Sequence, residues 1–335
     1  MKRTVVSVFM VLAMTVMMAA GCGKGNEGSQ DAGSGKSEGG KDGAYKVAFL
    51  PTDMSLTFAS WLADELTTAF EEYDDMELTV IDSQNVLETQ ISNMETCVSQ
   101  GYDYIILLPI EPAAEDDIVA GYIEQGTPMM NINLDDGGVE KASSVVANPY
   151  DLGTVVAEYA KEQIADDANV VVLLGPSGNT DSIERRRAYE DVFKDSNLNI
   201  MEEQIGDWEK SKGMEFMESW IQVHGDQIDA VLSMNDAMAI GAIEAAKDAK
   251  LDDIKFFGVD GLADAAVSIE DGGLDATALQ DAQVMAKEGA RVAHEVLTGE
   301  NKEGFEKVEI PVTLITSENV AEFIQRYTEN GMLTE

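Results

Sequence analysis

The residues of this sequence best suited to chemistry are Asn, Asp and Gln side chains that directly follow short apolar runs. Carboxylates accept hydrogen bonds, and side-chain amides both donate and accept them, so such residues can hold a polar ligand. The polar segments lie at 51–55, 131–133, 175–181, 233–236, 258–261 and 280–281. Ligands bind at the carboxyl ends of strands in open parallel sheets, and these segments take that place if the apolar runs are strands. The sequence therefore predicts a binding site at these junctions.

Residue types that perform catalysis are not arranged for it. The two histidines, His224 and His294, fall within helical patterns and join no Ser/His/Asp or Cys/His arrangement at a strand end. No Gly-x-Gly-x-x-Gly follows the first apolar run, and the Gly-rich segment at 175–178 lacks the Lys of a phosphate-binding loop. We read the paired acids at 116–117 as a solvated helix face. We therefore expect neither an enzyme nor a cofactor.

The elements that must position these segments alternate along the chain. Short apolar runs predict strands at 46–50, 78–81, 104–108, 129–132, 144–146, 170–174, 230–232, 255–259 and 276–279. Amphipathic patterns predict helices at 59–72, 86–100, 151–164, 182–194, 214–224, 237–249, 262–270 and 286–297. This alternation is typical of parallel sheets covered by helices on both faces. The number of units favours two doubly wound sheets of five or six strands, with a closed eight-stranded barrel as the alternative.

The N-terminus predicts export. Residues 1–21 combine a basic start, an apolar stretch and small residues before Cys22, as a secretory signal peptide does. The apolar stretch is short for a membrane span, so an uncleaved anchor is the weaker reading. Residues 22–44 are rich in Gly, Ser, Lys and Glu and predict a flexible tether. Cys97 is the only other cysteine, so we expect no internal disulfide and a buried thiol.

The charge of the chain excludes some partners. With 22 Lys and Arg against 63 Asp and Glu, the formal net charge is −41. Nucleic acids and anionic membrane surfaces are bound through basic patches, which this composition argues against. We read most of the carboxylates as a soluble surface. Membrane contact is expected through the N-terminal anchor alone.

The order of these elements and strand-end residues resembles the type I periplasmic binding protein family, of the ribose- and galactose-binding kind. The segments that carry the resemblance occur in the family's order from about Tyr45 to Thr316. They are 46–49 with Phe58, 101–109, 126–128, 181–185, 231–242, 257–261 and 276–280. Cys22 after Ala-Ala-Gly similarly resembles a bacterial lipobox, with Ala19 where Leu is usual.

The resemblance implies two similar α/β lobes joined by a three-segment hinge, with the ligand in the cleft between them. The implied lobes are 45–148 with 281–310, and 149–280 with 311–330. The implied ligand residues are Phe58, Asn133, Asp181, Arg185, Trp208, Asn235, Asp260 and Gln280. Leu56 and Leu134 stand where relatives place polar and basic residues, which leaves the identity of the sugar open. The calcium loop of some galactose binders is not recognisable, so no metal is expected.

The chemistry of this set agrees with a sugar. A guanidinium can donate in a fork, carboxylates can accept from paired hydroxyls, and amides can do both. Phe58 and Trp208 offer flat surface for the apolar face of a ring. Several members also have purely structural readings: Asn235 as a helix cap, Asp260 as part of a turn, Trp208 as core. Arg185 is the first of three consecutive arginines, of which two are expected at the surface beside local acids.

The resemblance implies an extracytoplasmic lipoprotein that acts as a monomer, captures a monosaccharide or small sugar, and delivers it to the membrane permease of an ABC importer. One alternative is a sensor that presents a sugar, nucleoside or furanose-like signal to a membrane receptor. Another is a transcription regulator with the same lobes. That reading needs a DNA-binding segment where this chain has its signal peptide and tether.

Overall fold

In a computed structural model of the chain, residues 43–135 and 137–334 are described. The predicted signal peptide, Cys22 and nearly all of the tether lie outside these residues. Among the described residues, no helix is both long enough and apolar enough to cross a membrane.

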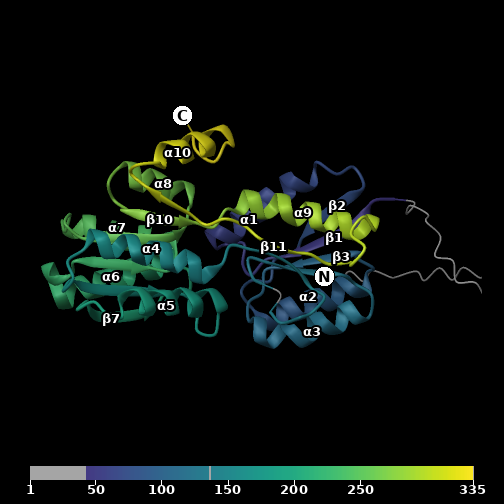
Figure 1. The fold of residues 1–335 in the computed structure, drawn as a ribbon, viewed down its shortest axis with the longest axis horizontal. Coiled ribbons are helices and arrows are strands. Elements are labelled where there is room, and N and C mark those ends of the chain that lie inside the picture. Colours follow the sequence, from purple (N-terminus) through teal and green to yellow (C-terminus); the bar gives the residue numbers. More distant parts are fainter. Residues whose placement is uncertain (1–42, 136, 335) are drawn as a thin grey trace, which may run out of the picture. The chain divides into compact units, whose positions relative to one another are not determined.

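The first sheet has six strands in the order β11-β5-β4-β3-β1-β2. Figure 1 labels β1, β2, β3 and β11 of this sheet. Its strands are β1 (Tyr45–Leu50), β2 (Met76–Val80), β3 (Tyr104–Leu107), β4 (Met129–Ile132), β5 (Ser143–Val146) and β11 (Lys307–Glu309). All of its strand pairs are parallel. Together with α1 (Thr57–Phe70), α2 (Leu87–Ser99), α3 (Pro112–Glu124) and α9 (Ala282–Thr298), it forms the first lobe.

The second sheet also has six strands, in the order β12-β10-β9-β8-β6-β7. Its strands are β6 (Asn169–Leu174), β7 (Asn199–Ile205), β8 (Ala230–Ser233), β9 (Lys255–Asp260), β10 (Ala276–Leu279) and β12 (Thr313–Thr316). The edge strand β12 runs antiparallel to β10, which departs from the all-parallel prediction. The helices of this second lobe are α4 (Pro149–Gln163), α5 (Thr180–Phe193), α6 (Lys210–His224), α7 (Asp236–Ala249), α8 (Ala263–Glu270) and α10 (Val320–Glu329), and a short 3₁₀ turn spans Gly225–Gln227.

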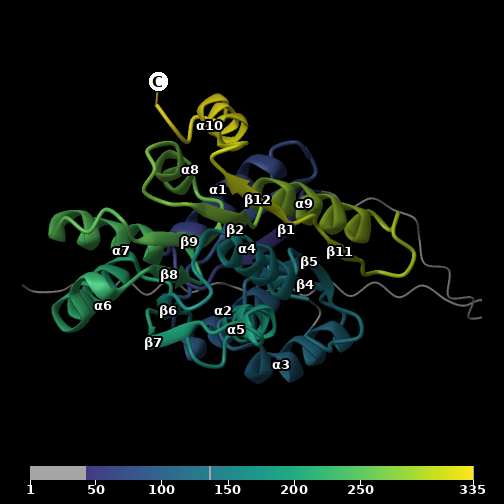
Figure 2. The same ribbon diagram turned by 60° about the vertical axis from the view of Figure 1, so that its left-hand side comes forward.

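Apolar residues on both faces of each strand explain the layering. In β1, Val47 and Phe49 belong to the cluster under α1 and α9, whereas Ala48 and Leu50 belong to the cluster under α2 and α3. Successive side chains of a strand point to opposite faces, so a continuously apolar strand needs helices on both sides. Cys97 is fully buried in the second of these clusters, as expected. In the second lobe, α6 and α7 pack as an adjacent pair (Figure 2).

The prediction of two doubly wound parallel-sheet lobes is confirmed, and the closed-barrel alternative is wrong. The chain leaves the first sheet after β5, returns to it with β11, and ends in the second sheet with β12. The exact lobe boundaries near 148, 280 and 310 stay a prediction. Three strands were not predicted, β7, β11 and β12. No helix range was predicted for α3 or α10, although the acids at 116–117, within α3, were read as a helix face.

Candidate ligand-binding site

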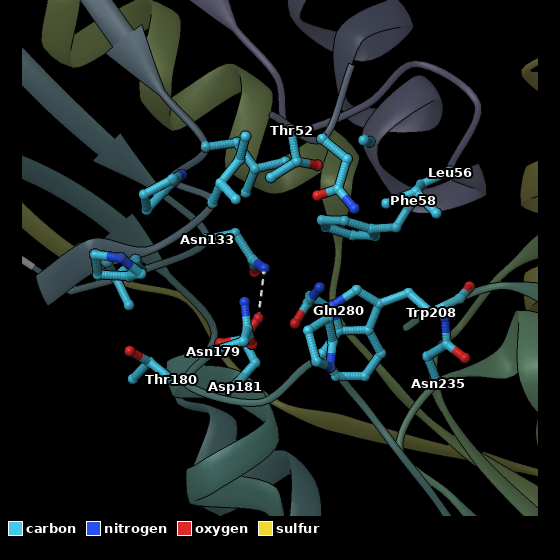
Figure 3. Close-up of a pocket in the computed structure, with 18 of the residues that line it drawn as sticks. Thr52, Leu56, Phe58, Asn133, Asn179, Thr180, Asp181, Trp208, Asn235 and Gln280 are labelled. Atoms are coloured by element: carbon cyan, nitrogen blue, oxygen red, sulfur yellow. Dashed lines mark hydrogen bonds between the residues drawn. The ribbon is translucent and has the colours of Figure 1, made fainter. Parts of the chain in front are cut away.

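A cavity of about 230 Å³ lies where the carboxyl ends of strands from both sheets meet. Its walls come from the segments that follow β1, β2, β3 and β4 in the first lobe and β6, β7, β8, β9 and β10 in the second. All eight predicted ligand residues line it: Phe58, Asn133, Asp181, Arg185, Trp208, Asn235, Asp260 and Gln280. Figure 3 labels all of these except Arg185 and Asp260. The structure therefore brings together residues that are up to 222 positions apart in the sequence, from Phe58 to Gln280.

Arg185 lies at the centre of the second-lobe side of this cavity and is almost fully buried. It sits in the second turn of α5, whose start is fixed by Asn179, since the Asn179 side chain accepts from the backbone N–H of Ser182. Its Nη1 donates to the carbonyl of Met234 and its Nη2 to Oε1 of Gln280, both at 2.6 Å. Its Nε has no protein partner. A buried donor without a partner is costly, so this N–H is available to a ligand oxygen.

Two carboxylates flank the Arg185 guanidinium without taking hydrogen bonds from it. Asp181 Oδ2 and Asp260 Oδ1 each lie 3.9 Å from its terminal nitrogens. Burial raises the pKa of Asp181, and Arg185 opposes that shift. Burial likewise raises the pKa of Asp260 well above its usual range, against the influence of Arg185. Both carboxyls therefore keep oxygens that can accept hydrogen bonds from a ligand.

Asn133 supplies the amide of the first lobe. It follows β4 with a φ of 63°, a left-handed conformation that Asn tolerates better than most residues. Its backbone N–H donates to the carbonyl of Val145, which fixes that conformation. Its Nδ2 donates to Oδ2 of Asp181 at 3.1 Å, and the two side chains point toward one another in Figure 3. Its Oδ1 is buried and has no protein partner.

Asn235 caps a helix, as its structural reading predicted, and it also lines the cavity. Its Oδ1 accepts from the backbone N–H of Met238, so it caps α7. Its Nδ2 donates to the carbonyl of Trp208 at 3.2 Å, which leaves one N–H of the amide for a ligand. Capping and lining thus coexist in one side chain.

Trp208 is not a core residue, because its ring forms one wall of the cavity. Asp207 and Trp208 both adopt positive φ, at 50° and 66°, and this places the indole over Gly175. A Cβ at position 175 would lie 2.0 Å from the ring, so only glycine allows this packing. The guanidinium of Arg185 lies 5.6 Å from the ring centroid, within cation–π range.

Phe58 lies on the opposite side of the cavity from Trp208 (Figure 3). Its ring meets Trp61 edge-on, with centroids 6.1 Å apart, and this contact holds it in place. Leu56 and Leu134 also line the cavity, so the two positions flagged as unusual lie at the site.

The loop that carries Asp260 is held from two sides. Oδ2 of the fully buried Asp236 accepts from the backbone N–H of Leu262 at 2.9 Å. From α10, the hydroxyl of Tyr327 donates to the carbonyl of Gly261. Asp260 itself has a φ of 127°, an unfavourable value for a residue with a Cβ, and these clamps maintain it. A Cβ on Gly258 would lie 2.2 Å from Asp236 Oδ1, so that glycine makes room for the carboxylate.

The cavity wall also includes residues of two strand-end segments that were predicted to bind, 51–55 and 175–181. These are Thr52, Pro176, Ser177, Asn179 and Thr180. The structure adds wall residues outside the predicted segments, namely Thr57, Ala59, Asn85, Leu108, Pro109, Ile110, Glu111 and Pro112. The rule of polar residues after strands would have found Asn85, because Asp82-Ser83-Gln84-Asn85 follows β2. The same rule applies to Glu111 after β3. Of the three arginines, Arg186 and Arg187 pair with surface glutamates as expected.

Within residues 43–135 and 137–334, no group of three or more His, Cys, Asp or Glu side chains is placed to hold a metal ion. The cavity lining combines hydrogen-bonding groups with aromatic and aliphatic side chains, which is the lining expected of a site for a small organic molecule.

Comparison with known proteins agrees with the fold and the site. The family profile described as "Periplasmic binding protein domain" matches residues 47–301. The chain therefore belongs to the periplasmic binding protein family. Its resemblance to the type I proteins that serve ABC transporters as sugar-binding components is confirmed, and these are binding proteins, not enzymes.

The chain is similar to several characterised members. It is 30% identical to the ribose import binding protein RbsB of Bacillus subtilis over 67% of this chain and 72% of that protein. It is 26% identical to the xylitol-binding protein of Mycolicibacterium smegmatis over 69% of this chain and 67% of that protein. A solute-binding protein of an ABC transporter from Bacillus halodurans, solved with bound myo-inositol, has a TM-score of 0.81 and 27% identity. The match covers 86% of this chain and all of that one.

Proposed function

We propose that this chain is an extracytoplasmic, lipid-anchored solute-binding protein that captures a monosaccharide or small polyol and delivers it to an ABC importer. The observation that carries the proposal is the convergence of the eight residues on one cavity, with polar groups and aromatic surface from both lobes. A binding protein needs such a site. An enzyme would also need catalytic groups in the cavity, such as the Ser/His/Asp or Cys/His arrangements considered above.

The hydrogen-bonding groups of the cavity suit a polyhydroxylated ligand. Arg185 Nε and the Nε2 of Gln280 can donate, while Asp181, Asp260 and Asn133 Oδ1 can accept. A hydroxyl group does both, so a ring or chain of adjacent hydroxyls can satisfy this mixed set. Ribose, xylitol and myo-inositol, which are named for the three relatives, share this feature. Phe58 and Trp208 supply apolar surface for the C–H face.

Ligand binding is proposed to close the two lobes about the hinge segments near 148, 280 and 310. Phe58 and Asn133 belong to the first lobe, and Arg185, Asp260 and Gln280 to the second. Neither lobe alone completes the site, so a ligand that contacts both favours the closed state. Small-angle X-ray scattering should show a smaller radius of gyration at saturating ligand. An unchanged radius would contradict closure.

Anchoring is proposed to occur through lipid on Cys22, with residues 1–21 removed. In a bacterial host, Cys22→Ala should move the protein from the membrane to the soluble fraction. Cys97→Ala is the matched control, because Cys97 is buried in the first lobe and should leave the location unchanged. If the Cys22 variant stays with the membrane, the apolar segment acts as an ordinary anchor.

The ligand class is tested by a thermal-shift screen of residues 43–335 against neutral sugars, polyols, nucleosides and amino acids, with calorimetry for each hit. Sugars or polyols should raise the melting temperature and bind at micromolar or tighter affinity. Asp260→Ala should weaken that binding at least tenfold, because a hydrogen bond to a charged group is worth about 1.5–3 kcal/mol. A screen in which only amino acids stabilise the protein would overturn the proposal.

A further inference from the structure

The cavity contains more acidic than basic side chains. Among the described residues that line it, Glu111, Asp181 and Asp260 are acidic and Arg185 is basic. Asp236, fully buried behind Asp260, adds another carboxyl to the same region. Arg185 alone therefore does not offset the burial of these carboxyls, and the pKa of Asp181 and of Asp260 stays raised beside it.

The hydrogen bonds of Arg185 leave those carboxylates available. Its two terminal nitrogens donate to neutral acceptors, the Met234 carbonyl and the Gln280 amide. Asp181 and Asp260 lie 3.9 Å away, beyond hydrogen-bonding distance. A carboxylate in a buried site without a hydrogen-bonded cation favours a ligand that brings positive charge.

An acceptor without a protein partner lies beside a carboxyl group at the Asn133 end of the cavity. Asn133 Oδ1 is buried without a protein partner, and Asn133 itself is only 6% exposed. Its Nδ2 donates to Asp181 Oδ2 at 3.1 Å, so the carboxylate and the orphan amide oxygen belong to neighbouring side chains (Figure 3). Asp135 adds negative potential here, because it raises the pKa of Asp181. This corner offers acceptors and negative charge together.

A protonated amino group matches this corner better than a hydroxyl. An ammonium has three donors and no acceptor, so it can bond Asn133 Oδ1 and Asp181 at once. A hydroxyl has a single donor, so it can donate to Asn133 Oδ1 or to Asp181 but not to both. Hydrogen bonds between an ammonium and a carboxylate are also stronger than those between neutral groups.

We propose that the Asn133–Asp181 corner binds the protonated amino group of an amino sugar or amino polyol. The rest of the ligand lies between Phe58 and Trp208, with its hydroxyls on Arg185, Asp260 and Gln280. This inference rests on the proposed function and narrows its ligand class. It also means that sugar acids are excluded, because a ligand carboxylate would face Asp181 and Asp260.

The test compares matched ligands by calorimetry at about pH 6.5, where amino groups carry a proton. The ligand series are glucose with glucosamine and glucuronate, galactose with galactosamine and galacturonate, and myo-inositol with its monoamino-deoxy isomers. At least one amino compound should bind tenfold or more tightly than its neutral parent, and the uronates should not bind.

Asp181→Asn then tests where the amino group binds, since it removes the negative charge with little change of shape. In this variant the ratio of amino-ligand affinity to neutral-ligand affinity should fall close to one. Asp195→Asn is the matched control, because it makes the same change of net charge at an exposed position after α5. The control should keep the wild-type ratio.

The outcomes separate this inference from the proposed function. Neutral parents that bind as tightly as every amino analogue would overturn the inference and leave the proposed function standing. A preference that survives Asp181→Asn would overturn the assignment to this corner. Failure of every neutral and amino compound to bind would overturn both.

Discussion

Nη2 of Arg185 donates a 2.6 Å hydrogen bond to Oε1 of Gln280, which stands 95 positions further along the chain. This bond fixes the orientation of the Gln280 amide, since the oxygen faces Arg185 and the NH₂ group is left to donate elsewhere. Both side chains are almost fully buried, at 2% exposure each. The second lobe therefore arranges its donors before a ligand arrives, and less ordering remains to be done on binding.

Gln280→Glu tests the role of that NH₂ group. The new carboxylate keeps the size of the side chain and can pair with Arg185, so folding should be maintained. The donor toward the cavity is lost, and affinity for the ligand should fall about tenfold, as expected for an unsatisfied ligand oxygen. Calorimetry measures the affinity. Gln283→Glu makes the same change just outside this cavity, and equal losses in both variants would contradict the assignment.

Arg185→Ala should affect both binding and stability. Removing one partner of a buried charge cluster leaves Asp181 and Asp260 close together without their cation. The free energy of unfolding should fall by about 3–5 kcal/mol and the affinity at least tenfold. Urea denaturation and calorimetry measure the two effects. Arg187→Ala is the control, because Arg187 is largely exposed, and it should change stability by less than about 1 kcal/mol. A comparable loss in the control would contradict the central role of Arg185.

Gly175→Ala should displace Trp208. The added Cβ would lie 2.0 Å from the indole, so the ring must leave its place at the cavity wall. Affinity for a ring-containing ligand should fall about tenfold as the stacking surface is lost. Gly121→Ala provides the control within α3, where no atom lies within 4 Å of the new Cβ. That change should raise stability by about 0.5–1 kcal/mol and leave binding intact.

The stability of the first lobe should depend on pH through Glu115. This buried carboxyl lies in the first turn of α3 and accepts from the backbone N–H of Glu111, while burial raises its pKa to about 7. A glutamate in an unfolded chain has a pKa of about 4.3. A carboxyl whose pKa is raised by folding contributes fully to the free energy of unfolding at a pH below its pKa in the unfolded chain. This contribution is lost as the pH rises through the folded-state pKa of about 7.

Glu115→Gln should remove that dependence. The variant should gain stability relative to the wild type at about pH 8 and show little gain at about pH 4, in urea denaturation at both values. Asp117→Asn changes an exposed acid of the same helix and serves as the control. If the free energy of unfolding of the variant differs from that of the wild type by the same amount at both pH values, the role of burial is contradicted.

The predicted strands were found because buried parallel strands are continuously apolar. The missed strand β7 reads Asn-Ile-Met-Glu-Glu-Gln-Ile and lies at the edge of its sheet. All seven of its residues are exposed or half-buried, so it lacks that signal. β11 has no buried residue and β12 buries only its last two, so neither strand is continuously apolar and buried. Several helices begin two to four residues earlier than predicted. For example, α4 starts at Pro149, where Asn148 caps the helix.

The site was predictable where residues follow strands and hidden where it depends on three-dimensional contacts. The strand-end rule led to Asp260 and Gln280, but it gives no sign that Gln280 accepts from Arg185. Nor does the sequence indicate that Asn133 and Asp181 meet, because they come from different lobes. Positive φ at Trp208 also leaves no signature in its residue type.

The central claim is that the cavity between Phe58 and Trp208 is the ligand site, and Trp208 fluorescence tests it most directly. The chain has three tryptophans, so Trp61→Phe with Trp220→Phe leaves Trp208 as the reporter. Titration with the sugar, polyol or amino compound found in the screens should give a saturable change at one ligand per chain, with the dissociation constant measured by calorimetry. Calorimetric binding without any change in Trp208 fluorescence would place the ligand elsewhere and contradict the account.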